Sequence, residues 1–162
     1  MNLDGGILSM QVKLEDIIEG IEMQSEENRS YLNLKTGAIS YVSLEALLMA
    51  EDEEEYEHLP QWQQDEVRIA IDIIETFNDY VSLPSSFDIN EYQIMEDFCF
   101  SLADDKKRDI LLDSIRGKGA FRRFKDKASQ TGISHQWYDY RDKRYKEIAI
   151  EFCKNNNIDY IE

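Results

Sequence analysis

Cysteine and histidine are scarce in this sequence, which contains two of each. Cys99 and Cys153 are isolated within apolar helical patterns, and neither has the close spacing of a metal knuckle or a redox pair. His58 and His135 are far apart and lack the HExxH arrangement of a zinc protease. The sequence therefore predicts two buried thiols in a reducing compartment, and it supports neither a metal site nor a cofactor.

Long apolar runs are absent as well. No stretch approaches the roughly 18 to 20 apolar residues that cross a bilayer. The N-terminus has neither the basic start nor the apolar stretch of a signal peptide. We therefore expect a soluble, cytoplasmic protein without membrane contact. We also expect residues 1–9, which contain Gly5-Gly6, to be a loose extension before a single domain over residues 10–162.

Catalytic patterns are missing too. The serines near turns have no GxSxG elbow, and no carboxylate pair stands out from the acidic background. Six acids lie within residues 51–57, but they lack the ligand order of a calcium loop, so a solvated charge run is the favoured interpretation. Enzyme activity therefore has no support in the sequence.

Positive charge is unevenly placed along the chain. Residues 1–102 carry 4 Lys and Arg against 23 Asp and Glu, a net −19, whereas residues 103–162 carry 14 against 11, a net +3. Between Lys106 and Lys146 there are 13 basic and 5 acidic residues, a net +8. Two segments of opposite charge must face either each other or partners.

Hydrophobic periodicity predicts a helix-rich α+β fold with a small three-stranded antiparallel sheet. Alternating residues around Gly37 predict a two-stranded ribbon over residues 30–43, and the short segment 80–83 suits an edge strand beside it. The last two helices form a C-terminal helical hairpin with a stop at Gly132. Apolar residues that recur every three or four positions predict helices over residues 14–24, 44–57, 60–79, 88–102, 105–115, 120–129 and from 134 onward.

Several local expectations accompany these helices. Ser43 is expected to cap the second helix, and its acidic end is expected to fray. Asp88 and Glu91 have the spacing of a capping box. The helix that follows Pro60 is expected to bury a broad apolar face made of Trp62, Val67, Ala70, Ile71, Ile74 and Phe77.

The segment 117–125 combines glycines, a helix start and several cations. Free backbone amides and positive charge at such a place can hold a phosphate or a carboxylate. The alternative is a helix-loop-helix corner in which Phe121 and Phe124 are buried and Arg122 and Arg123 pair with the acidic half. The GxxxxGK[ST] pattern of a P-loop is absent.

The last helix adds Arg141 and Arg144 among aromatic residues, an arrangement that can stack on nucleobases. Arg141 shares a stripe with Trp137, so we expect it to be partly buried and paired with a carboxylate such as Asp88 or Glu91. The net charge of −16 opposes nucleic-acid binding. The candidate anion-binding residues are Lys118, Gly119, Arg122, Arg123, Arg141 and Arg144.

Six segments of the chain have the character of sequence motifs. The strongest motif is in residues 117–126 (GKGAFRRFKD), followed by residues 137–141 (WYDYR) and 148–152 (IAIEF). Weaker motifs are VKLEDII at residues 12–18, YLNLKTG at 31–37 and FDINEY at 87–92. With these motifs, residues 10–157 resemble uncharacterised protein family 0158. The resemblance implies a bacterial cytoplasmic setting and supplies no catalytic residues.

The favoured hypothesis is a non-enzymatic interaction protein. In it, the basic segment docks partly on the protein's own acidic half, and the remaining acidic surface binds a basic protein partner. The alternative is a binding module for nucleic acid or a phosphorylated ligand at the basic corner formed by residues 118–144. A third hypothesis is that the acidic half mimics a nucleic acid. Oligomeric state does not follow from the sequence.

Overall fold

A computed structural model describes residues 10–162 of the chain, so the extension expected at residues 1–9 lies outside the described residues. The chain divides into two compact units. Unit 1 comprises residues 1–88 and 149–162, and unit 2 comprises residues 89–148. We describe each unit by itself, and one domain over residues 10–162 stays a prediction.

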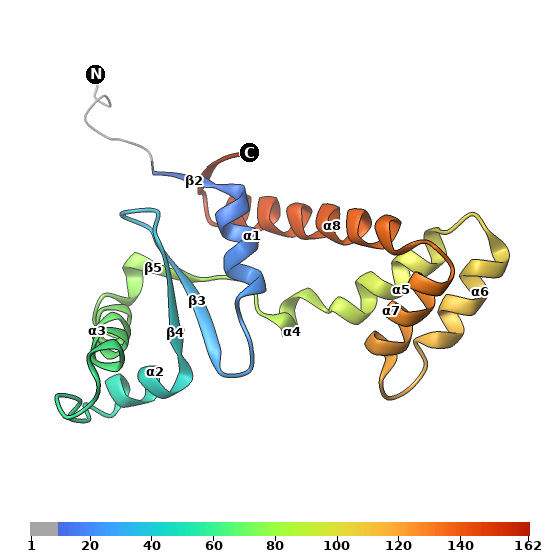
Figure 1. Cartoon of the computed structure of the whole chain (residues 1–162). Helices are drawn as coiled ribbons and strands as arrows, with labels where there is room; N and C mark the ends of the chain where they lie inside the picture. Colours follow the sequence, from blue (N-terminus) through green and yellow to red (C-terminus); the bar gives the residue numbers. More distant parts are fainter. Residues whose placement is uncertain (1–9) are drawn as a thin grey trace, which may run out of the picture. The chain divides into compact units, whose positions relative to one another are not determined.

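Unit 1 contains the predicted antiparallel sheet, in the order β4-β3-β5 (Figure 1). Strands β3 (Asn28–Asn33) and β4 (Ile39–Ser43) form the ribbon, in which Leu32 is opposite Ile39. The turn between them requires the positive φ of 80° at Gly37. The edge strand β5 (Tyr80–Ser82) pairs with β3 on its other side, as predicted.

A second, parallel pair of strands in unit 1 was not predicted. Strand β2 (Gln11–Lys13) pairs with β6 (Asp159–Ile161), and Val12 is opposite Tyr160. Helix α1 (Leu14–Glu22) follows β2 and covers the face of the sheet that carries Ser30. The buried Ser30 hydroxyl donates a hydrogen bond of 2.7 Å to the carbonyl of Gly20. This bond satisfies a polar group that burial would otherwise penalise.

Helices α2 (Leu44–Glu51) and α3 (Gln61–Glu75) lie beside β4 (Figure 1). Ser43 caps α2 as predicted, because its hydroxyl accepts a hydrogen bond of 3.0 Å from the amide of Ala46. Helix α2 ends at Glu51, six residues before the predicted end, where acidic side chains oppose the helix dipole. A core cluster joins the two helices through Ala46, Val67 and Ala70, with partly buried neighbours that include Met49, Ala50, Tyr56 and Ile71.

The predicted apolar face of α3 was wrong in part. Trp62 is 66% exposed, and Phe77 is 72% exposed in the short 3-10 helix η1 (Phe77–Asp79) beyond the end of α3. Trp62 lies about 140° around the helix axis from the buried Val67, so it is off the packed face. Ile73 is buried, whereas Ile74 is exposed.

Unit 2 is helical. Helix α4 (Ser86–Ile89) spans the division, and helices α5 (Glu91–Ser101), α6 (Asp105–Ser114) and α7 (Ala120–Gln130) follow. Helix α8 (Ser134–Asn155) contributes its residues up to 148 to unit 2 and the rest to unit 1. Gly132, with φ of 75°, follows the end of α7 as predicted. The fold is therefore α+β with a C-terminal pair of helices.

The capping box predicted at Asp88 and Glu91 was wrong. Asn90 caps α5 instead, since its side-chain oxygen accepts a hydrogen bond of 3.2 Å from the amide of Gln93. Asn90 has φ of 52°, a left-handed conformation that Asn tolerates better than most residues. The Asp88 carboxylate accepts hydrogen bonds from the amide and the hydroxyl of Ser85, which hold the pKa of Asp88 below its usual range.

The core of unit 2 includes a group of aromatic rings from three helices. Phe98 of α5, Phe124 of α7 and Trp137 of α8 are buried, and their rings meet edge to face. Such contacts fix ring orientation as well as burying apolar area. Cys99 and Cys153 are both free and buried, which confirms the predicted pair of buried thiols. No helix among the described residues is long and apolar enough to span a membrane.

Candidate functional site

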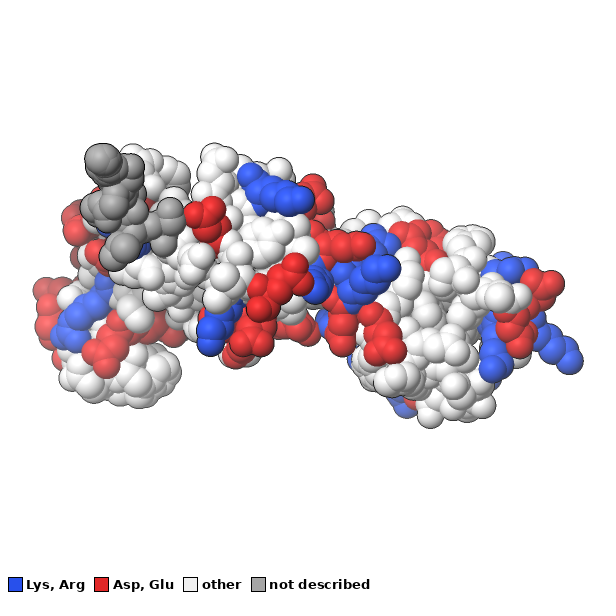
Figure 2. Space-filling view, turned by 90° about the horizontal axis from the view of Figure 1, so that it is seen from above, with Lys and Arg blue, Asp and Glu red and all other residues white. Residues whose placement is uncertain are grey.

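The two units differ sharply in net charge. Unit 1 contains 5 Lys and Arg against 23 Asp and Glu, a net −18, and unit 2 contains 13 against 11, a net +2. On the face shown in Figure 2, blue and red side chains are interspersed over unit 2. The acidic character of the chain therefore belongs to unit 1, and unit 2 is close to neutral.

Arg123 is committed to the backbone. Its guanidinium donates a hydrogen bond of 2.9 Å to the carbonyl of Ser114, and it also reaches the carbonyls of Arg116, Gly117 and Lys118. These carbonyls lie at the end of α6 and in the loop that follows, where helix geometry leaves acceptors unsatisfied. The expected pairing of Arg123 with the acidic half was wrong, because the unpaired carbonyls lie closer.

Arg141 is paired as predicted. Its Nε lies 2.7 Å from Oε1 of Glu91, and the two side chains are 21% and 36% exposed respectively. The guanidinium also lies over the ring of Tyr145, with 4.2 Å from Cζ to the ring centre. One of the two proposed partners, Glu91, is therefore the correct one.

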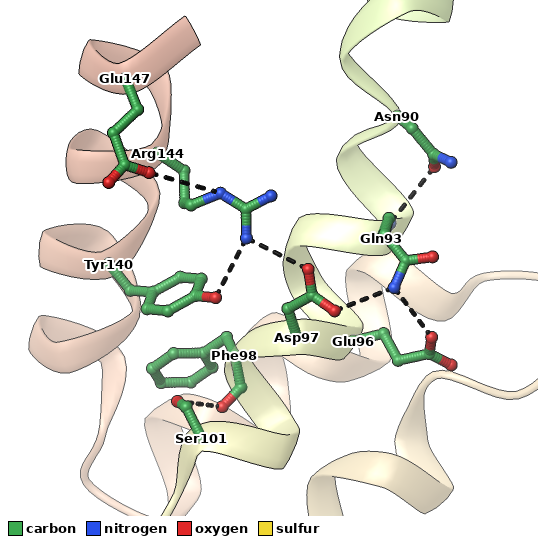
Figure 3. A network of polar contacts seen from close by, with 9 residues as sticks. All are labelled: Asn90, Gln93, Glu96, Asp97, Phe98, Ser101, Tyr140, Arg144 and Glu147. Carbon is green, nitrogen blue, oxygen red and sulfur yellow. Dashed lines mark hydrogen bonds and ion pairs between the residues drawn. The ribbon is translucent and has the colours of Figure 1, made fainter.

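Arg144 belongs to a network of polar contacts (Figure 3). It donates hydrogen bonds of 3.1 Å to Asp97 and to the hydroxyl of Tyr140, and Glu147 lies 3.8 Å from its Nε. Asp97 also accepts a hydrogen bond of 2.9 Å from Gln93. The bonds from Gln93 and then Arg144 lower the pKa of Asp97, and the bond to Asp97 raises the pKa of Arg144.

The remaining candidate residues face solvent. Lys118 and Arg122 are exposed, and neither forms an ion pair within the described part of the chain. The expected pairing of Arg122 with an acid was therefore wrong. Gly119 precedes α7 with φ of 76°, and an added Cβ would lie 3.1 Å from the guanidinium of Arg123. Phe124 is buried as expected, but Phe121 is 44% exposed.

The five charged candidate residues thus fall into two groups. Arg123, Arg141 and Arg144 have their charges engaged inside unit 2, with backbone carbonyls or with carboxylates. Lys118 and Arg122 remain available to a ligand. Glu91 and Asp97, which pair with the two arginines of α8, both come from α5, and Glu147 of α8 also lies near Arg144. The sequence analysis did not identify Asp97 as a partner of Arg144, because the two residues are 47 positions apart and leave no local signal.

A groove in unit 1 is lined by six glutamates. It has a volume of about 460 Å³ between the end of α2, the loop after it and α3. We call it the acidic groove. Its apolar floor is formed by Met49, Ala50, Tyr56, Ile71 and Ile74. Its carboxylate rim is formed by Glu51, Glu53, Glu54, Glu55, Glu57 and Glu75.

The floor of the acidic groove is anchored. Met49, Tyr56 and Ile71 pack against the core cluster of α2 and α3. The rim, in contrast, is solvated: all six of its glutamates are exposed, and none forms an ion pair with a residue that the structure describes. The sequence predicted the charge run but not the apolar floor beneath it.

The turn that carries the rim is strained. The amides of Glu53 and Glu54 donate to the carbonyls of Ala50 and Met49, which is the Schellman pattern at a helix end. Glu53 occupies the left-handed position with φ of 54°, where glycine is favoured. A residue with a Cβ, such as Glu, lowers the stability at this position by about 1 kcal/mol relative to glycine. The turn therefore places an additional negative charge on the rim at a cost in stability.

Comparison with known proteins gives a family and no activity. The sequence matches the Uncharacterised protein family (UPF0158) over residues 8–162, nearly the whole chain. The chain belongs to this family. No curated protein and no solved structure matches it. Membership of UPF0158 confirms the resemblance seen in the sequence, but the function must be argued from the residues themselves.

Proposed function

We propose that this UPF0158 member is a non-enzymatic bacterial interaction protein of the cytoplasm that binds a basic segment of a protein partner in the acidic groove. The observation that carries the proposal is the coincidence of an anchored apolar floor with a rim of solvated carboxylates that lack cationic partners among the described residues. Such a surface attracts positive charge and also offers area to bury.

The chemistry of the groove favours lysine and arginine side chains. Their aliphatic stems can lie along Met49, Ile71 and Ile74 while their charged ends reach the rim, because long cationic side chains separate an apolar stem from a charged head. The net −18 of unit 1 increases the rate at which a basic partner is captured. The strained backbone at Glu53 is consistent with this role, since backbone strain is often retained at functional positions.

The alternative is a binding module for nucleic acid or a phosphorylated ligand at residues 118–144. Of the five candidate cations in this range, Arg123, Arg141 and Arg144 are engaged with acceptors in unit 2, which leaves Lys118 and Arg122. Phosphate binding depends on the number of cations that reach the backbone. The observations therefore favour the acidic groove.

The test compares two triple variants of equal charge. In the groove variant, Glu53, Glu54 and Glu55 become Gln. In the control, three other exposed acids of unit 1 become Gln, namely Glu19, Glu26 and Glu27. The probe is a synthetic amphipathic peptide of lysine and leucine, titrated into each ¹⁵N-labelled full chain at low and high salt. We expect the peptide to shift signals of the groove residues.

The groove variant should bind the peptide about tenfold more weakly, because three rim charges of about 0.5 kcal/mol each are lost. The control should change affinity by less than about threefold, since its charges act only through the long-range field. Equal losses in both variants would refute the groove as the site. A duplex DNA oligonucleotide that binds and shifts the signals of Lys118 and Arg122 would support the alternative instead.

A further inference from the structure

Unit 2 contains a second hollow that neither the basic segment nor the acidic groove explains. It lies between the start of α5, helix α7 and helix α8, and its volume is about 370 Å³. We call it the aromatic cavity. Pockets that bind small molecules begin at about 300 Å³, so the aromatic cavity is large enough for a ring with a substituent.

Four aromatic side chains line the aromatic cavity. Phe124 and Trp137 are buried, and their ring centres lie 4.9 Å apart with the planes at 80°. Both also contact Phe98 edge to face, which fixes their orientation. Phe121 and Tyr138 are 44% and 50% exposed. The cavity therefore presents rigid apolar walls next to partly open rings, a shape that suits a planar aromatic ligand.

One polar group of the wall is unsatisfied. Trp137 is 3% exposed, and its indole Nε1 is buried without a hydrogen-bond partner among residues 10–162. A buried donor without an acceptor is costly, and an indole N–H can only donate. A ligand with a carbonyl or carboxylate oxygen would supply the missing acceptor.

The charges of the lining select the sign of the ligand. The Arg141 guanidinium is paired with Glu91 at 2.7 Å, so these two charges compensate each other. Lys125 is exposed and has no ion pair or hydrogen bond to a residue in the described range. The lining thus has a net charge of +1. It offers a counterion to an anionic ligand and no uncommitted carboxylate to a cationic one.

We propose that the aromatic cavity binds a small aromatic carboxylate, whose ring lies against Phe121, Phe124, Trp137 and Tyr138 and whose carboxylate is held by Lys125 and the indole N–H of Trp137. The ring of such a ligand matches the aromatic walls, and its carboxylate matches the Lys125 charge and the unsatisfied indole N–H of Trp137. This site is in unit 2, so it is independent of the acidic groove, and the two proposals can fail separately.

The test uses the fact that the chain has two tryptophans. In a ¹⁵N-labelled full chain with Trp62→Phe, which replaces an exposed residue, Trp137 gives the single indole N–H signal. The probe is 2-naphthoate, and 2-naphthalenemethanol is its neutral analogue. We expect a saturable downfield shift of the Trp137 signal with 2-naphthoate and at least tenfold weaker binding of the alcohol.

Two variants and one control locate the site. Lys125→Gln should weaken 2-naphthoate binding about five- to tenfold, and Phe121→Ala should weaken binding of both compounds. Lys143→Gln removes the charge of an exposed lysine of α8 that does not line the cavity, and it should leave the affinity unchanged. A well-dispersed amide spectrum of each free variant, with signals remote from the cavity unshifted, shows that the fold is intact. The absence of a saturable shift, or equal affinity of Lys125→Gln and Lys143→Gln, would overturn the proposal.

Discussion

The pairing of Arg141 with Glu91 makes a measurable prediction about how the basic segment is neutralised. The perturbation is a double-mutant cycle with Glu91→Ala, Arg141→Ala and the double variant, which isolates the interaction between the two side chains. Both partners belong to unit 2 and are joined by a contact of 2.7 Å between Nε and Oε1.

The magnitude follows from distance and burial. Two unit charges about 4 Å apart attract by about 4 kcal/mol at an effective dielectric constant of about 20. Desolvation and the ordering of two long side chains offset most of this, and fully exposed pairs retain only about 0.2 to 1 kcal/mol. Because Arg141 and Glu91 are 21% and 36% exposed, we expect a coupling energy of about 1 to 1.5 kcal/mol.

The single variant Arg141→Ala should cost more than the coupling energy. Its guanidinium also lies over the ring of Tyr145, a contact that contributes about 0.5 to 1 kcal/mol at partly exposed sites. The loss of that contact is common to the single and the double variant. It therefore cancels in the cycle and does not inflate the coupling energy.

The assay is urea unfolding followed by the fluorescence of Trp137 in the Trp62→Phe background, because Trp137 is buried in the same unit as the pair. The control is the pair Arg116 and Asp113, which is 4.0 Å apart with both side chains 81% exposed, and its coupling should be close to zero. A coupling below about 0.3 kcal/mol for Arg141 and Glu91 would refute the inference that α8 is neutralised by α5.

Two further predictions concern pKa values. Hydrogen bonds from Gln93 and Arg144 lower the pKa of Asp97, so its stabilising contribution is present above pH about 4 and is lost as the pH falls through the folded value. Asp97→Asn should lower the free energy of unfolding at pH 7 by about 0.5 to 1 kcal/mol and flatten its fall below pH 4 in urea titrations; an unchanged pH profile would contradict this. Burial raises the pKa of the Cys99 thiol to about 11 and also raises that of Cys153, so both thiols should react with a disulfide reagent at pH 8 more slowly in the folded chain than in urea, by at least about 100-fold for Cys99. Similar rates in both states would exclude buried thiols.

Elements with a local signal could be predicted from the sequence. The ribbon was found because Gly37 supplies the positive φ that its turn requires, and α2 because Ser43 is a good cap. The parallel pair β2 and β6 could not be found. Each strand has three residues, and the partners Val12 and Tyr160 lie at opposite ends of the chain. Their pairing depends on tertiary contacts that leave no periodic pattern.

Helix ends were predicted less well, because several residues compete for one role. Asp88 and Asn90 can both cap a helix. The backbone conformation decides which of the two side-chain oxygens lies near the first free amides of the helix. Asn90 has that role in the structure, and Asp88 closes a turn with Ser85. Trp62 and Phe77 show a related difficulty: Trp62 lies off the packed face of α3, Phe77 lies beyond the end of the helix, and both are exposed.

The candidate anion site shows why counting charges overstates what a ligand can reach. Arg122 and Arg123 are adjacent and equally charged, yet they lie about 100° apart around α7. Arg123 therefore meets the carbonyls at the end of α6, whereas Arg122 remains in solvent. Direction around the helix, and not charge, separates a structural arginine from an available one. The net +8 of residues 106–146 is therefore not a surface of +8, and a single uncommitted lysine beside an aromatic cavity is more selective than a diffuse basic patch would be.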